Sequence, residues 1–204
     1  MKLYYAPRTI SVAVAIALNE AGLAHDLHKL DFAAGEQTRP DYHRINPKGR
    51  VPALQTDTGI LTETGAILEY IAAIAPEADL MPAAPEDAAR VRAVMYYLAS
   101  TMHVNHAHNT RAYRWADQPA SHADMKAKVA QNMTDSARHI DGDCLTGPFV
   151  MGARPCIADF YLFVVCSWLE GDGVDVSAFP RIVAFRAAME ARPSVQAARK
   201  AGLL

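Results

Sequence analysis

The first eighty residues alternate between short apolar runs and longer helical patterns. Four short runs bounded by turn-forming residues predict strands, at residues 2–5, 25–31, 52–56 and 60–63. Between the first two runs, apolar residues follow from Ser11 to a stop at Gly22, which predicts a helix. A helix between two strands makes them parallel neighbours, so the chain opens with a βαβ unit.

The last two predicted strands form a hairpin, because Asp57-Thr58-Gly59 supplies turn residues between them. A short helical piece at 40–45 precedes them and ends before Asn46-Pro47. After the hairpin a helix begins at Thr64 and carries apolar residues on one face at helical spacing: Ile67, Ile71 and Ile74. This half of the chain is therefore mixed α/β.

Prolines mark a change of pattern after the first half. Pro76, Pro82 and Pro85 lie close together, where neither a helix nor a sheet continues easily. Beyond them strand patterns disappear, and helical patterns cover 86–116, 121–141, about 155–170, 179–192 and a short segment to 201. We expect three parts: a mixed α/β domain at 1–77, a linker at 78–85 and an all-α domain at 86–204.

Composition excludes several classes of protein. The 204 residues carry a net charge of -2, which gives no field that favours nucleic acid or an anionic membrane. No apolar run approaches the roughly 18 residues that span a bilayer, and Arg8 and Glu20 bound the N-terminal run too closely for a secretory signal. Three cysteines without a C-x-x-C pattern favour a reducing compartment, so we expect a cytoplasmic protein.

The stretch from Val51 to Thr64 indicates a binding site. Pro52 cannot donate to a sheet ladder, so Val51-Pro52 predicts the mouth of a strand, with a cis bond as one option. Glu63 and Thr64 place a carboxylate and a hydroxyl at a helix N-terminus, where free N–H groups attract an anion. Strand-edge backbone beside an anion site suits a small peptide-like acid.

These features together resemble a bacterial glutathione transferase, closest to its beta-like members. The resemblance covers essentially the whole chain, through the βαβ unit, Val51-Pro52, Glu63-Thr64, the Gly152 to Asp159 stretch and the Ala188 to Val195 segment. It implies a homodimer that uses glutathione as co-substrate and adds the glutathione thiolate to small hydrophobic electrophiles. The resemblance also implies that the first half is a thioredoxin-like, glutathione-binding domain. No metal is expected.

The resemblance also assigns contacts for the tripeptide. The Val51 backbone would pair with the cysteinyl backbone, and Pro52 would fix that geometry. Glu63 and Thr64 would hold the γ-glutamyl end, although Glu63 also reads as an ordinary acid in a first helical turn. Two loop cations, either of which could be simply solvated, are candidates for the glycyl carboxylate: Lys48 and Arg50.

The thiol chemistry falls on the loop before the first helix. Beta-like members usually carry a cysteine at the place of Ile10, so mixed-disulfide chemistry is not expected, and hydroxyl assistance from Ser11, or secondly Thr9, remains. Lowering a thiol pKa by two units needs about 2.7 kcal/mol. One hydrogen bond to a charged acceptor contributes about 1.5–3 kcal/mol, so one hydroxyl suffices. For Ser11 a helix N-cap role is the alternative.

Three histidines lie in the predicted helix 86–116. His103 matches a histidine near the active site of beta-like members, and His106 shares its helix face, while His108 points elsewhere. His103 and His106 could contact substrate, line the cleft for the electrophile or the dimer face, or only pack against neighbouring side chains. A metal site needs three or four converging ligands, which this pattern does not offer. Further along, Asp159 completes a capping box on Cys156, a weak cap.

Two other functions fit the same pattern. A glutathione-dependent isomerase, peroxidase or dehalogenase would use glutathione as a cofactor and regenerate it rather than consume it. A non-catalytic member would use the fold as a protein-interaction module. The charged Glu63 beside a helix opening favours a retained site.

Overall fold

The protein, described by a computed structural model over all 204 residues, divides into two compact units. The first consists of Met1–Ala83 together with Met189–Leu204, and the second of Ala84–Ala188. The first unit is therefore built from two separate parts of the chain. The units are described one at a time.

The first unit contains a four-stranded mixed sheet in the order β2-β1-β3-β4. Its strands are β1 (Lys2–Tyr5), β2 (Asp26–Lys29), β3 (Ala53–Thr56) and β4 (Gly59–Thr62). β2 runs parallel to β1, while β3 is antiparallel to both β1 and β4. The α/β fold class and the hairpin are confirmed. The strand predicted at 25–31 is shorter than expected, since Leu30 already lies outside β2.

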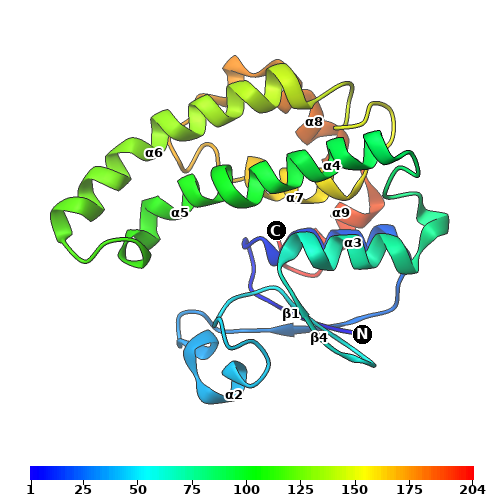
Figure 1. Cartoon of the computed structure of the whole chain (residues 1–204), viewed down its shortest axis with the longest axis horizontal. Coiled ribbons are helices and arrows are strands. Elements are labelled where there is room, and N and C mark those ends of the chain that lie inside the picture. The colour runs from blue at the N-terminus through cyan, green and yellow to red at the C-terminus, as the bar shows by residue number, and fades with distance from the viewer. The chain divides into compact units, whose positions relative to one another are not determined.

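Helices cover this sheet. α1 (Ser11–Glu20) is buried from Ser11 to Leu18 and packs against β1 and α3 (Thr64–Ile74). Figure 1 shows α3 on one side of the sheet and the short α2 (Pro40–His43) on the other. Ile67 and Ile71 are buried as predicted, but Ile74 is 41% exposed because it is the last residue of its helix.

The C-terminal segment packs against α1. α9 (Pro193–Lys200) contacts α1, and the carboxylate of Glu20 accepts hydrogen bonds from Arg192 Nε (3.1 Å) and Ser194 Oγ (2.5 Å). Burial opposes ionisation of Glu20, but the bonds from Arg192 and Ser194 outweigh it and lower the pKa of Glu20 below its ordinary value. The N–H of Arg8 also donates to the carbonyl of Leu203 at 2.9 Å. These contacts fasten residues 189–204 to the first unit.

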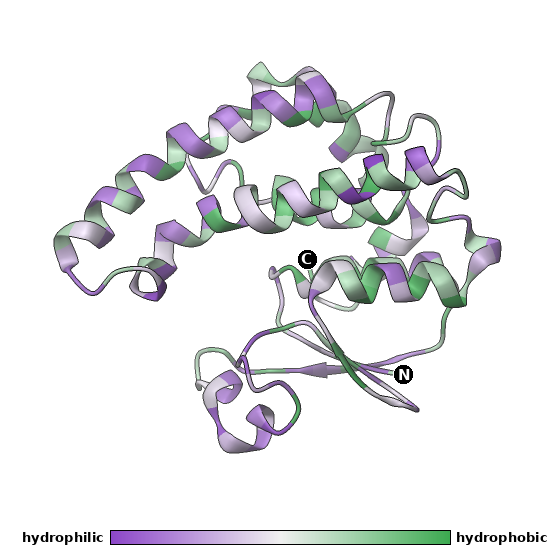
Figure 2. Cartoon of the chain, in the orientation of Figure 1, coloured by the Kyte–Doolittle hydropathy of each residue, from purple (hydrophilic) through white to green (hydrophobic).

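The second unit consists of helices. They are α4 (Pro85–Tyr97), α5 (His103–Arg111), α6 (Pro119–His139), α7 (Ile157–Cys166) and α8 (Pro180–Glu190), the last of which ends just inside the first unit. α4 and α5 form the rod predicted at 86–116, joined by a π-helical turn at Leu98–Met102 (Figure 1). Figure 2 shows hydrophilic and hydrophobic residues alternating along α6, as expected of a helix with one face on the core. The remaining helices begin and end within a few residues of their predicted bounds.

α7 is the central helix of this unit, and every one of its residues is buried. Asp159 accepts from the Cys156 N–H at 2.7 Å and from the Val150 N–H at 2.8 Å. The predicted capping box is confirmed. The Asp159 carboxylate also holds the loop before α7 in place, through the hydrogen bond from the Val150 N–H. None of the helices is both long and apolar enough to cross a membrane.

Candidate functional site

The predicted strand mouth is present in the first unit. The Val51-Pro52 bond is cis, and β3 begins just after it at Ala53. Neither the N–H nor the C=O of Val51 is hydrogen-bonded within the chain, while its side chain packs against the core cluster around Tyr42. The Val51 backbone is therefore held in place and can pair with an extended peptide.

The loop before Val51 is fixed by side chains that sequence reasoning passed over. The Tyr42 hydroxyl donates to the Arg50 carbonyl at 2.7 Å, and Asn46 Nδ2 donates to the same oxygen at 2.6 Å. Burial is the main reason that the pKa of Tyr42 rises to about 12. A phenol and an amide thus hold the carbonyl next to Val51 from two sides.

Gly49 belongs to the same loop and cannot be replaced freely. Its φ is 61°, a left-handed conformation that glycine adopts without steric cost. A Cβ at this position would lie 2.9 Å from the carbonyl oxygen of Gln37, which is too close. The segment Asn46-Pro47-Lys48-Gly49 is therefore a tight turn whose glycine is required by the neighbouring backbone.

Glu63 and Thr64 open α3 as predicted. Glu63 is the N-cap residue, with φ 71° and ψ 120°, a conformation rare for a residue other than glycine. Non-glycine residues in such conformations gather at ligand sites. No acceptor within the chain takes the first N–H groups of α3, and the Thr64 hydroxyl makes no hydrogen bond. The N-terminus of α3, which follows Glu63, therefore has free N–H donors and is suited to bind a carboxylate.

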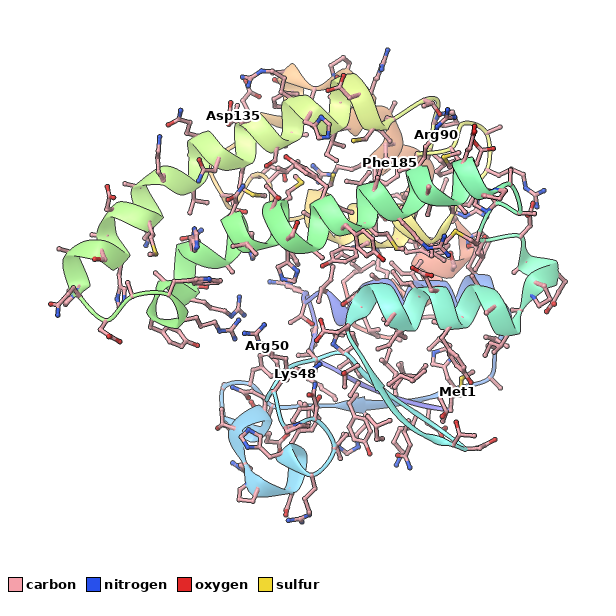
Figure 3. All side chains as sticks on the ribbon, in the orientation of Figure 1. Met1, Lys48, Arg50, Arg90, Asp135 and Phe185 are labelled. Carbon is pink, nitrogen blue, oxygen red and sulfur yellow. The ribbon has the colours of Figure 1, made fainter.

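The two cations assigned to the glycyl carboxylate differ. Lys48 Nζ donates to Glu63 Oε1 at 2.5 Å and to Thr62 Oγ1 at 2.7 Å. Arg50 makes no side-chain contact and is exposed; Figure 3 labels both residues beside the loop that precedes β3. Lys48 is thus already bonded to Glu63, the residue predicted to contact the γ-glutamyl end, whereas no hydrogen bond or ion pair engages the Arg50 side chain.

The loop before α1 carries a pair of bonded hydroxyls. Thr9 Oγ1 lies 2.7 Å from Ser11 Oγ and 2.8 Å from the Ala6 carbonyl, and Ser11 Oγ accepts from the Ala6 N–H at 3.2 Å. Ser11 is fully buried, and the N-cap of α1 is Ile10 with no side-chain bond. The interpretation of Ser11 as an N-cap is therefore wrong: the helix already includes Ser11, whose hydroxyl points back to Ala6.

A cavity opens beside Thr9. It has a volume of about 570 Å³ and lies between the end of β1, the start of α1 and the loop after β2. It is lined by Ala6, Pro7, Thr9, Lys29, Leu30, Asp31, Phe32 and Glu36. Thr9, but not Ser11, is part of this lining. The side of the cavity is therefore formed in part by Thr9, whereas the Ser11 hydroxyl is buried behind Thr9.

In the second unit two of the three histidines of α5, His103 and His106, contact Trp168. His103 Nδ1 lies 3.1 Å from the Tyr161 hydroxyl, and His106 Nδ1 lies 2.7 Å from Asp172 Oδ2. Both rings contact Trp168, at centroid distances of 5.0 Å for His103 and 4.2 Å for His106. The shared helix face is confirmed. No group of three or more His, Cys, Asp or Glu side chains in the chain is arranged to hold a metal ion.

The cysteines do not form thiolates readily. Burial raises the pKa of Cys144 to about 11 and that of Cys166 to about 12, and burial also raises the pKa of Cys156. All three are free thiols. None is therefore a thiol of low pKa.

Sequence reasoning missed Asp172 and Tyr42. Asp172 is 66 residues from its partner His106, so no local pattern links them. Tyr42 falls in the predicted helical piece at 40–45, where it reads as an apolar contact. Only a polar atom on an otherwise buried residue could have suggested a partner in the following loop.

Comparison with known proteins identifies the family. Residues 1–73 match the glutathione S-transferase N-terminal domain, and residues 108–201 match the glutathione S-transferase C-terminal domain. A glutathione S-transferase of Escherichia coli is 30% identical over 205 residues, with 98% of each chain covered. A maleylacetoacetate isomerase of Rhizobium meliloti is 32% identical over 178 residues, covering 85% of this chain and 83% of that protein.

A solved structure points to the same family. A glutathione transferase homologue from Sulfitobacter, crystallised with bound glutathione, has a TM-score of 0.98 and 55% identity, covering 100% of this chain and 98% of that one. The chain belongs to the glutathione S-transferase family. The thioredoxin-like fold with an added helical domain, expected from the sequence, is that of this family.

Proposed function

We propose that this enzyme conjugates glutathione to small hydrophobic electrophiles, with the thiolate stabilised by the hydroxyl of Thr9. The observation that carries the proposal is the Thr9–Ser11 pair at the opening of α1, beside a cavity of about 570 Å³. In this arrangement Thr9 contacts the sulfur and Ser11 is a positioning residue. The support is that Thr9 lines the cavity, whereas Ser11 is fully buried.

The hydroxyl pair has enough donors for this role. Ser11 accepts from the Ala6 N–H, and its one proton can go to Thr9 or to the Ala6 carbonyl. Thr9 gives its proton to the Ala6 carbonyl in the absence of ligand and can redirect it to a thiolate. A hydrogen bond to a charged acceptor contributes about 1.5–3 kcal/mol, which matches a thiol pKa lowered by about one to two units.

The tripeptide is held along the stretch from Val51 to Thr64. The free Val51 backbone pairs with the cysteinyl residue, and Pro52 keeps that backbone turned outward. The free N–H groups of α3 and the Thr64 hydroxyl take the γ-glutamyl carboxylate, and Glu63 takes its ammonium. The exposed Lys48–Glu63 pair is easily exchanged for that ammonium, because such pairs contribute about 0–1 kcal/mol.

The same proposal includes the coarser organisation of the protein. We assign residues 1–77 to the glutathione-binding domain, 78–85 to a linker and 86–204 to the helical domain; the packing of 189–204 on α1 crosses that division. We also propose a cytoplasmic homodimer of the beta-like type without a bound metal, in which His103 and His106 contact the substrate. Sedimentation equilibrium and metal analysis of the purified protein test the dimer and the metal.

A binding experiment tests the assignment of Glu63. Glutathione affinity is measured by calorimetry for the wild type and for Glu63→Gln, with Glu77→Gln as the matched control because it removes another exposed acid at the start of a short helix. Loss of a charged hydrogen bond predicts at least a tenfold weaker Kd for Glu63→Gln, from about 1.4 kcal/mol per tenfold. If Glu63→Gln and Glu77→Gln changed the Kd for glutathione equally, the assignment of Glu63 as a glutathione contact would be wrong.

A second candidate function is glutathione-dependent isomerisation, favoured by the likeness to the maleylacetoacetate isomerase of Rhizobium meliloti. The two functions differ in the fate of glutathione. Conjugation consumes one glutathione per electrophile, whereas isomerisation releases it again. Titration of free thiol during turnover of a cis-enone separates them: a falling thiol concentration supports conjugation, and a constant one supports isomerisation.

A further inference from the structure

A cysteine, a histidine and an aspartate are bonded in series where α6 ends. The sulfur of Cys144 lies 3.5 Å from His139 Nε2, and His139 Nδ1 lies 2.9 Å from Asp143 Oδ2. The three residues come from the last turn of α6 and from the π-helical turn Ile140–Cys144 that continues it. All three belong to the second unit.

The hydrogen bonds run in one direction through these side chains. A carboxylate only accepts hydrogen bonds, so Nδ1 of His139 donates to Asp143. In the neutral ring Nε2 is then the acceptor, and the thiol of Cys144 donates to it. A nucleophile bonded to a base that a third group orients is the arrangement used in nucleophilic catalysis. Cys144 is thus placed to give its proton to His139 when its sulfur attacks.

Neighbouring side chains hold this arrangement in place. The Tyr97 ring meets the His139 ring edge-on, with the ring centroids 4.7 Å apart. Nη1 of Arg181 donates to three carbonyls around the π-helical turn, at 3.2–3.3 Å: Asp141, Gly142 and Leu145. The backbone on both sides of Cys144 is therefore fixed, and the sulfur keeps its place beside the imidazole.

A base is needed at this sulfur, because the thiol does not ionise readily by itself. Burial, and after it the charge of Asp143, raise the pKa of Cys144 to about 11. At pH 7.5 only about one thiol in 3,000 would then be a thiolate. Proton transfer to His139 during the attack avoids that limit, just as a serine hydroxyl reacts beside its histidine without a low pKa.

Exposure separates Cys144 from the other two cysteines. Cys144 is partly exposed, whereas Cys156 and Cys166 are 3% and 0% exposed. Thiol–disulfide exchange requires that the attacking sulfur be accessible to the disulfide. Of the three thiols, Cys144 therefore combines access with a base.

We propose that Cys144 is a modification site, at which glutathione disulfide forms a mixed disulfide with the protein. His139 Nε2 takes the thiol proton while the Cys144 sulfur attacks one sulfur of the disulfide. The bond between the two glutathione sulfurs breaks, and the departing thiolate takes the proton from the imidazolium. Cys144 is oxidised and half of the disulfide is released as reduced glutathione, so no other oxidant takes part.

The inference does not depend on the conjugation proposed above. Its three side chains belong to the second unit, whereas the hydroxyls of Thr9 and Ser11 belong to the first. Its reactant is the oxidised form of the ligand found in the similar Sulfitobacter structure. Loss of conjugation in a Thr9 variant would therefore leave the modification of Cys144 unchanged.

The experiment incubates the full chain with excess glutathione disulfide at pH 7.5 and follows the adduct by intact-protein mass and peptide mapping. The wild type should gain one glutathione, on Cys144, and dithiothreitol should remove it. In His139→Ala the rate should fall about 100-fold, as expected on loss of a general base. The matched control His122→Ala removes another histidine of α6, whose Nε2 lies 2.6 Å from the Ala116 carbonyl oxygen, and should react at the wild-type rate.

Free imidazole distinguishes a base from a structural contact. It should restore part of the rate in His139→Ala and leave the wild-type rate unchanged. Asp143→Asn changes a side chain that is 74% exposed, and it should slow the reaction by about tenfold because the amide no longer selects the tautomer with Nε2 as acceptor. Asp135→Asn, which changes another exposed acid of α6, should have no effect.

Three results would overturn the inference. The first is an adduct on Cys156 or Cys166 with none on Cys144, and the second is an equal rate in the wild type and His139→Ala. The third is a slow His139→Ala reaction that imidazole does not restore, together with a wild-type rate in Asp143→Asn, because His139 would then only support the fold around the sulfur.

Discussion

Removing the Thr9 hydroxyl should raise the pKa of the bound glutathione thiol. Thr9→Val keeps the shape of the side chain and deletes the one hydroxyl that both lines the cavity and is bonded to Ser11. A hydrogen bond to a thiolate contributes about 1.5–3 kcal/mol, and one pKa unit corresponds to 1.36 kcal/mol, so the increase should be about one to two units. At pH 7, returning the thiol pKa from about 6.5–7.5 to its free value of about 8.5 lowers the thiolate fraction, and with it kcat/KM, by about 8- to 25-fold.

Ser11→Ala should act mainly on stability. It leaves the buried N–H of Ala6 without its side-chain acceptor, a loss of about 1–3 kcal/mol. For a chain of this length each kcal/mol lowers Tm by about 2–4 °C, so a decrease of about 2–12 °C is expected. The thiol pKa should change less than in Thr9→Val, because Thr9 keeps its own proton.

The assay is a pH titration of the ultraviolet absorbance of the bound thiolate, paired with a thermal melt of each variant. The reasoning is refuted if the thiol pKa is unchanged in Thr9→Val and raised in Ser11→Ala. That result would mean that the buried serine reaches the sulfur directly and that Thr9 only supports it. Ser100→Ala is a suitable control, because it deletes an exposed hydroxyl bonded to a carbonyl of its own helix.

Three further outcomes are expected. Tyr42→Phe should weaken glutathione binding by only a few-fold in calorimetry, since the Arg50 carbonyl keeps a second donor; an effect above about tenfold would exceed one neutral hydrogen bond of about 0.5–1.5 kcal/mol. Gly49→Ala should destabilise the fold by at least about 1–2 kcal/mol in urea melts, because φ is 61° and the new methyl group meets the Gln37 carbonyl; an unchanged midpoint would contradict the turn described. Because the pKa of Glu20 is lowered in the folded protein, its stabilising effect is present above its unfolded pKa of about 4.3 and is lost as pH falls through the folded value. Glu20→Gln should therefore have a lower Tm at neutral pH and a flatter fall in acid than the wild type, and parallel curves for the two proteins would show that the carboxylate does not contribute.

Local patterns were sufficient to predict the strands, the hairpin and the start of α3. Ile67 and Ile71 follow from helical spacing, and the Val51-Pro52 mouth follows from the missing N–H of proline. Ser11 shows the limit of such patterns. A serine near a helix start favours capping, but its position one residue later in the helix turned its hydroxyl inward to Ala6, and spacing alone does not resolve one residue.

Only part of the candidate site could be predicted from the sequence. His103 and His106 were placed on one face because three residues separate them on a helix. The partner of His106 was not predicted, because Asp172 lies beyond the end of α7 and meets α5 only through tertiary packing. The π-helical turn at Leu98–Met102, which sets the direction of that face, also has no sequence signature of its own.

The packing of residues 189–204 on α1 has a consequence for how the protein is made. The sheet, α1 and the loops proposed to bind glutathione are synthesised first, but the Glu20 carboxylate can bond Arg192 and Ser194 only after about 170 further residues have been added. Because synthesis adds roughly 5–20 residues per second, the face of α1 that packs against α9 stays uncovered for many seconds. The first unit is thus completed last, although most of it is synthesised first.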